Sequence, residues 1–188
     1  MRGKTKGRFR KPQPQGTADR ISVGTLPART VRISEAVLLR HPPEQVWELI
    51  FPAEHAPVLS PNIVRGFAVP GTPTVGVGHQ QCFTDVAGNT SILEVIEHEA
   101  GRRAVTRTIS PRPAVPHRMV HLVDPAPNGT VLSLGIEIDV PAGQQIDPGF
   151  EPLQRRGLRD YLDRAQRALA MAETTRTTNR GRHARLDD

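Results

Sequence analysis

Two histidines four residues apart, His117 and His121, are the first side chains of this sequence to suggest chemistry. On a helix that spacing places both rings on one face, as in many zinc sites. Prolines bound the segment at Pro116 and Pro125, however, and the pattern between them predicts a strand. Residues four apart in a strand are separated by about 13 Å, too far for two ligands of one ion. We therefore expect no metal site here.

The alternation of a strand puts His117, Met119, His121 and Val123 on one face, and the sequence leaves open whether that face points inward. Exposure at the surface or the sheet edge is the simplest interpretation for histidine. In an apolar interior, a neutral imidazole could instead hydrogen-bond a ligand carbonyl or act as a general acid or base. Tyr161 is a further candidate, since its hydroxyl needs a partner wherever it is buried.

Sequence patterns of several enzyme classes are missing, namely the phosphate-binding G-x-x-x-x-G-K-[ST] loop, the dinucleotide-binding G-x-G-x-x-G and the G-x-S-x-G elbow. The single cysteine, Cys82, excludes an intramolecular disulfide and favours a reducing, cytoplasmic setting. No run of about 18 apolar residues predicts a membrane span, and the basic N-terminus lacks the apolar stretch of a signal peptide.

The net charge of +6 belongs to the ends of the chain. Residues 1–30 hold eight Lys or Arg and one acid, and residues 174–188 hold four Arg and two Asp, so residues 31–173 carry a net charge of −3. We predict a disordered basic tail over 1–27, one domain over 28–173 and a disordered tail over 174–188. The basic tail allows weak contacts with anionic partners, but we expect no specific nucleic-acid binding.

The elements that must position the candidate residues follow from periodicity and turn residues. We expect a strand over 30–39, a helix over 43–50 that starts at a proline pair, a short helical turn near 53–59, and strands near 62–69, 76–85, 90–98, 102–109, 117–124 and 130–140. Short turns between consecutive strands indicate an antiparallel meander. The pattern ends in a long helix, for which Asp147 offers a cap and Pro148 a proline in the first turn.

The last strand and the last helix each have one apolar side. In the strand, Leu132, Leu134, Ile136 and Ile138 alternate with polar residues. In the helix, apolar residues recur at spacings of three and four; they are Leu153, Leu158, Tyr161, Leu162, Ala165, Leu169 and Ala172. Only the sheet offers an apolar partner large enough for this helix, which predicts an α+β fold with a curved antiparallel sheet wrapped around it.

The order of short motifs adds a resemblance to this pattern. A strand is followed by Pro43-Glu-Gln-Val-Trp-Glu-Leu-Ile50, then by Val69-Pro-Gly71, Gly76-Val-Gly78, Asn128-Gly-Thr130 and the long helix. This order resembles the SRPBCC superfamily, which contains START-related, polyketide cyclase/dehydrase and pollen-allergen-like proteins, over roughly residues 31–173. The resemblance implies the helix-grip fold, with two short helices after the first strand and a ligand cavity between the sheet and the last helix.

Three hypotheses for function follow, and they are ordered here by preference. The first is binding of a small hydrophobic molecule, lipid-like or polyketide-like, in that cavity. The second is a cyclase or dehydratase that moves protons with positioned polar side chains and needs no cofactor. The third is an interaction protein with a filled core and a basic tail. The sequence leaves the oligomeric state open.

For the first hypothesis, the residues expected to line the cavity come from the apolar faces of the last strand and helix and from the histidine strand; they are Leu132, Leu134, Ile136, Leu158, Tyr161, Leu162, His121 and His117. Apolar burial would supply affinity, and Tyr161 or His121 would orient the ligand.

Overall fold

A computed structural model of the protein describes residues 29–113 and 115–183, with side chains in the last helix as far as Thr174. The predicted basic tail over 1–27 lies outside the described residues. In chain order the elements are β1 (Arg29–Leu39), α1 (Pro43–Ile50), the 3-10 turn η1 (Ala53–His55), α2 (Ala56–Leu59), β2 (Ile63–Ala68), β3 (Gln80–Asp85), β4 (Thr90–Glu99), β5 (Arg103–Ser110), β6 (His117–Ala126), β7 (Gly129–Val140) and α3 (Phe150–His183).

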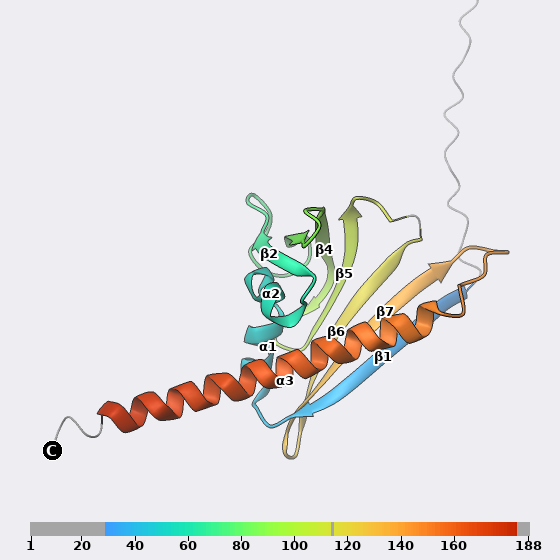
Figure 1. The fold of residues 1–188 in the computed structure, drawn as a ribbon. Coiled ribbons are helices and arrows are strands. Elements are labelled where there is room, and N and C mark those ends of the chain that lie inside the picture. The colour runs from blue at the N-terminus through green and yellow to red at the C-terminus, as the bar shows by residue number, and fades with distance from the viewer. Residues whose placement is uncertain (1–28, 114, 184–188) are drawn as a thin grey trace, which may run out of the picture.

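The strands form one antiparallel sheet in the order β1-β7-β6-β5-β4-β3-β2, so the predicted meander from β2 to β7 is confirmed. The first strand closes the sheet by pairing with the last, from Arg29 opposite Val140 to Leu39 opposite Thr130. Register shifts lie in the β2–β3 and β4–β5 pairs. Such bulges bend strands and increase their twist, which helps the sheet to curve around α3 (Figure 1).

One strand starts later than the sequence predicts. We expected a strand over 76–85, but β3 begins at Gln80. Gly76 and Gly78 have φ angles of +89° and +86°, which lie outside the extended region, so this segment turns before the strand begins. The turn brings Gly78 N–H to the carbonyl oxygen of Val95 at 2.8 Å, which anchors it to β4.

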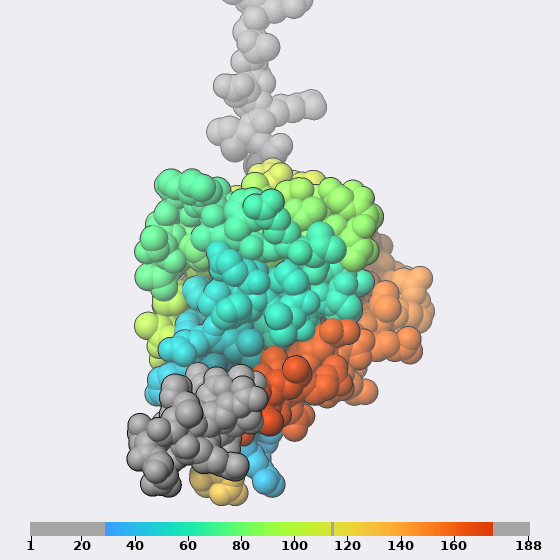
Figure 2. Space-filling view, turned by 60° about the vertical axis from the view of Figure 1, so that its left-hand side comes forward, coloured from blue at the N-terminus to red at the C-terminus, as the bar shows by residue number. Residues whose placement is uncertain are grey.

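The long helix α3 crosses the concave face of the sheet, as Figure 1 shows. Its buried side chains recur at three and four residues: Leu158, Leu162, Ala165 and Leu169. Leu153 and Ala172, which the sequence placed on the same stripe, are exposed. They share one core cluster with the buried face of β7 and with α1, which contributes Val46 and Ile50. Figure 2 shows the surface of α3, in orange and red, directly beside the blue and green segments that carry α1 and α2. The predicted helix-grip fold is confirmed.

The ends of α3 differ from the sequence prediction. The helix begins at Phe150, and Asp147 stands just before it, where its Oδ1 accepts a hydrogen bond from the Gly149 N–H at 2.6 Å. At the other end the helix runs to His183, ten residues beyond Glu173, through a segment for which we predicted disorder. Two reasons account for the extension. The segment contains no proline to break the helix, and extending an established helix costs less free energy than starting a new one. No helix in the described residues is long and apolar enough to cross a membrane.

Charged side chains fasten α3 to the edge strand β1. Glu35 faces the helix, and its Oε1 accepts hydrogen bonds from Arg159 Nη2 and Arg155 Nη1, each at 3.1 Å. Arg155 also donates to the backbone oxygen of Ser34 at 3.1 Å and to Glu151 at 2.8 Å. The hydrogen bonds from Arg159 and Arg155 hold the pKa of Glu35 below its ordinary value. These groups close the edge between β1 and the helix.

A close backbone approach at Gly66 gives a testable consequence for stability. A Cβ atom at this position would lie 2.0 Å from the carbonyl oxygen of Ala53. The Gly66→Ala variant must therefore push η1 away from β2, and we expect a loss of about 2 kcal/mol in the free energy of unfolding. Gly135→Ala is the matched control, since its nearest neighbours would lie at ordinary contact distances of 3.6 to 3.8 Å. Equal urea midpoints for the two variants would contradict the prediction.

Candidate ligand cavity

The register of β6 settles which of its faces points inward. His121 lies opposite Leu134, Met119 opposite Ile136 and Val123 opposite Leu132, and the β7 partners are all buried. Residues directly opposite each other in an antiparallel pair share a face. The face that carries His117, Met119, His121 and Val123 is therefore the inner face, and the solvent-facing interpretation of these histidines is wrong.

Three cavities follow this inner face beneath α3. The inner cavity, of about 290 Å³, lies against β3, β4 and β5; the middle cavity, of about 200 Å³, lies between β7 and α3; the outer cavity, of about 470 Å³, lies at the start of α3. Met119 lines all three. His121 and Tyr161 line both the inner and the middle cavity, and Ile136 and Gln154 line both the middle and the outer one. The cavities thus form one series.

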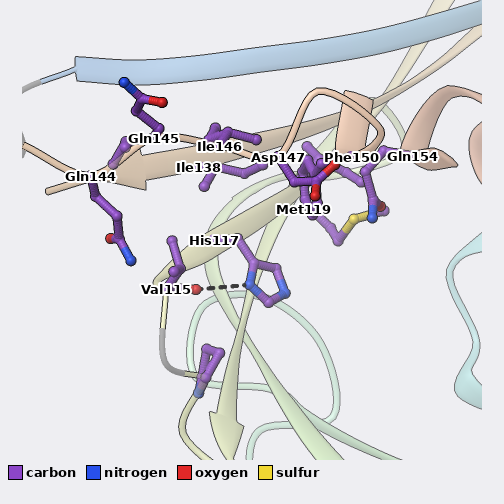
Figure 3. A pocket seen from close by; sticks show the side chains of 13 residues that line it. Val115, His117, Met119, Ile138, Gln144, Gln145, Ile146, Asp147, Phe150 and Gln154 are labelled. Carbon is purple, nitrogen blue, oxygen red and sulfur yellow. Dashed lines mark hydrogen bonds between the residues drawn. The ribbon is translucent and has the colours of Figure 1, made fainter. Parts of the chain in front are cut away.

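The outer cavity combines an apolar wall with polar side chains (Figure 3). Ile138, Ile146 and Phe150 belong to the wall, and Figure 3 shows Met119 and Gln154 together at one end and Gln144 and Gln145 toward the other. His117 lines this cavity, and its Nδ1 lies 3.2 Å from the carbonyl oxygen of Val115. The backbone on both sides of this cavity comes from the β5–β6 and β7–α3 connections.

His121 and Tyr161 meet where the inner and middle cavities join. Their ring centroids are 6.4 Å apart in an edge-on arrangement. Burial lowers the pKa of His121 to about 4 and raises the pKa of Tyr161. His121 is half-buried and lines both cavities. At neutral pH both side chains are therefore uncharged.

The ring nitrogens of His121 form no hydrogen bond with the described part of the chain. The Tyr161 hydroxyl donates one long bond, 3.5 Å, to the carbonyl oxygen of Ile50. A neutral imidazole carries one donor and one acceptor nitrogen. The junction of the two cavities therefore offers unused hydrogen-bonding capacity in an apolar setting.

Four more polar residues line the inner cavity: Ser60, Gln81, Ser91 and Thr106. The side-chain amide of Gln81 already forms a hydrogen bond within the protein, since its Nε2 donates to the carbonyl oxygen of Phe51 at 2.7 Å. The hydroxyl oxygen of Thr106 is buried and has no hydrogen-bond partner among the described residues. Sequence reasoning missed Thr106 and Met119 as lining residues. The sequence shows which residues share a face within each strand. It does not show that Thr106 lies opposite Met119, which only the register of β5 and β6 reveals.

The structure brings together most of the residues that the sequence singled out. Leu134, Ile136, Leu158, Tyr161 and His121 line the middle cavity, while His117 lies in the outer one.

Leu132 and Leu162 are buried in the core and line none of these cavities. Leu132 lies between Val37 and Val123, toward the end of the sheet that α1 covers, so side chains fill that end. The apolar faces were therefore predicted correctly, but the cavities open along only part of each face, and the rest is packed.

His117 lines the outer cavity, whereas His121 lines the inner and middle cavities. In the described part of the chain no group of three or more His, Cys, Asp and Glu gathers as a metal ion would require. Arg107, which stands between Thr106 and Thr108 in the sequence, is exposed and donates to Glu94 at 2.7 Å.

Comparisons with known proteins agree with this architecture. The sequence profile of the family described as "Polyketide cyclase / dehydrase and lipid transport" matches residues 30–171. No curated protein matches the sequence.

Among solved structures, XoxI from Bacillus cereus is 18% identical with a TM-score of 0.60, over 76% of this chain and 98% of its own. The di-domain ARO/CYC StfQ from the steffimycin biosynthetic pathway is 15% identical with a TM-score of 0.60, over 78% of this chain and 52% of its own. Ara h 8.0201 is 13% identical with a TM-score of 0.57, over 76% of this chain and 99% of its own. At these identities the structures speak for the fold alone. Because the family profile covers most of the chain, the protein belongs to the polyketide cyclase/dehydrase and lipid transport family of the SRPBCC superfamily.

Proposed function

We propose that this protein binds a small hydrophobic molecule, lipid-like or polyketide-like, in the cavities between the sheet and α3. The observation that carries the proposal is the row of three neighbouring, mostly apolar cavities that Met119 lines. Polyketide chemistry and lipid transport both handle hydrophobic molecules, so family membership supports such a ligand in general. The total space suits a molecule of a few rings or a medium-length chain.

The affinity would come from apolar surface removed from water, at roughly 25 cal/mol per Å². Ile136, Leu134 and Leu158 supply part of that surface. Orientation would come from the few polar groups at the junction, chiefly His121 and Tyr161. An apolar cavity with a small number of placed polar groups is typical of small-molecule binding sites.

Catalysis by a cyclase-type or dehydratase-type mechanism is the second candidate, and one observation favours it. Two titratable side chains, His121 and Tyr161, converge inside the cavities, as proton transfer to a bound substrate would require. Their pKa values, however, argue against proton transfer by these two side chains. A histidine with a pKa of about 4 is a poor base at neutral pH, and a tyrosine with a raised pKa is a poor acid. Carriage therefore ranks above catalysis.

The third hypothesis, an interaction protein with a filled core, has less support. The interior holds cavities of about 290, 200 and 470 Å³. The basic tail on which that hypothesis also depends lies outside the described residues.

Titration with N-phenyl-1-naphthylamine, an uncharged fluorescent probe, tests the proposal. We expect saturable enhancement with one probe per chain, a dissociation constant in the micromolar range and displacement by unlabelled hydrophobic molecules. Heat-unfolded protein is the control for nonspecific enhancement. A linear, unsaturable response that no competitor reduces would overturn the proposal.

A further inference from the structure

We infer that the ligand is uncharged and is anchored through one hydroxyl or carbonyl oxygen at His121, at the junction of the inner and middle cavities. The inference rests on the proposed function and narrows it to a ligand class. It separates neutral oxygenated molecules, such as phenols, alcohols and ketones, from carboxylates and other ions. Three features of the described structure carry it: the uncharged wall, the free imidazole and the placement of the charged side chains.

The uncharged wall is the first feature. Of the described residues that line the inner and middle cavities, none is Asp, Glu, Lys or Arg. An ion placed there would lose its hydration without gaining a countercharge, which costs several kcal/mol. The outer cavity adds only one charged residue, Asp147, and a carboxylate at that position repels an anionic ligand.

The free imidazole is the second feature. His121 projects from the inner face of β6 opposite Leu134, so its ring stands among apolar side chains. Neither ring nitrogen has a hydrogen-bond partner in the described part of the chain, although both cavities reach the residue. An oxygen atom of a ligand can accept from its N–H, and a hydroxyl can also donate to its second nitrogen. An ion is not needed for this contact.

The charged side chains of the surrounding elements are the third feature, because they are already occupied elsewhere. Glu35 faces α3 but accepts from both Arg155 and Arg159. On β5 and β6, Arg107 pairs with Glu94, and Arg118 pairs with Asp139. None of these residues lines the inner or middle cavity. A charged ligand in the inner or middle cavity would therefore meet none of these groups as a free counterion.

A matched series of bicyclic probes tests the inference, namely naphthalene, 2-naphthol and 2-naphthoate at pH 7.5, titrated into the full chain and followed by amide NMR shifts. One hydrogen bond of ordinary strength makes 2-naphthol bind about three- to tenfold more tightly than naphthalene. The desolvated carboxylate makes 2-naphthoate bind at least about tenfold more weakly than 2-naphthol. In the His121→Phe variant, the preference for 2-naphthol over naphthalene should disappear while naphthalene affinity is kept.

The outcomes separate the two proposals. If no member of the series binds, and the fluorescent probe does not bind either, the proposed function itself fails. If 2-naphthoate binds as tightly as 2-naphthol, the ligand class is wrong although the cavities bind ligands. If 2-naphthol shows no advantage over naphthalene in the wild-type chain, His121 is not an anchor. The comparisons among the three probes on the wild-type chain do not depend on any variant. Should His121→Phe fail to fold, Thr106→Val provides a second variant in the wall of the inner cavity.

Discussion

Replacing Gly157 with phenylalanine should weaken binding of N-phenyl-1-naphthylamine at least about 100-fold, which corresponds to about 2.7 kcal/mol. Gly157 lines the middle cavity, and a Cβ atom at this position would meet no other atom within 4 Å. It falls on the same stripe of α3 as Gln154 and Tyr161, both of which line that cavity. Gly157 is exposed on α3, so a benzyl side chain there can fold over the middle cavity without displacing the core.

Gly157→Ala is the matched control for this variant. It should bind the probe as the wild type does and should raise the free energy of unfolding by about 1 kcal/mol, because alanine favours the helix over glycine. The phenylalanine variant should not unfold at a lower temperature than the wild type. A folded Gly157→Phe protein that binds with unchanged affinity would place the ligand outside the middle cavity.

A second large effect concerns acid stability. In the folded chain the pKa of His121 is about 4, whereas an exposed histidine in the unfolded chain titrates near 6.5. Between these two values the unfolded state binds a proton that the folded state rejects, so lowering the pH favours unfolding. The contribution of His121 to the free energy of unfolding is fully present above pH 6.5 and is lost as the pH falls toward 4. The total loss is about 3 kcal/mol, at about 1.4 kcal/mol per pKa unit.

Urea unfolding of the wild type and of His121→Phe between pH 7.5 and pH 4 measures this contribution. The difference in unfolding free energy between the two proteins cancels the titration of groups that they share. Tyr161, the titratable neighbour in the cavity wall, stays protonated over this range. We expect the variant to gain about 3 kcal/mol relative to the wild type as the pH falls. A difference that does not change with pH would mean that the ring is hydrated in the folded protein.

The elements of the fold followed from the sequence because local chemistry fixed them. The proline pair set the start of α1 at Pro43, and turn residues separated the strands. The alternation from Leu132 to Ile138 gave the buried face of β7 without any knowledge of neighbours. The apolar spacing of α3 identified the side that packs on the sheet, and its far end was missed because nothing local stops a helix there.

The inner face of β6 was harder to predict because both faces look alike in sequence. One carries His117, Met119 and His121, and the other carries Val120 and Leu122. Hydrophobicity alone favours neither, and only the pairing of His121 with Leu134 decides the question.

The cavities lay beyond sequence reasoning for a different physical reason. Leu134 and Leu158 line open space, whereas Leu132 and Leu162 have the same chemistry but are packed solid. The difference depends on where α1 and α2 come to rest beneath the sheet, and that placement is a property of the whole fold. The same applies to Thr106, which lines a cavity because β5 pairs with β6 in one register.

The central claim is that a hydrophobic guest occupies the space between the sheet and α3. Methionine labelled with ¹³C at its ε-methyl group tests it most directly, since the chain has three methionines. Met119 lines all three cavities, while Met171 is 71% exposed on α3 and serves as an internal control. Saturation with N-phenyl-1-naphthylamine should shift the Met119 methyl signal and give intermolecular nuclear Overhauser effects to it, with Met171 unchanged. A bound probe that leaves Met119 unaffected would contradict the account.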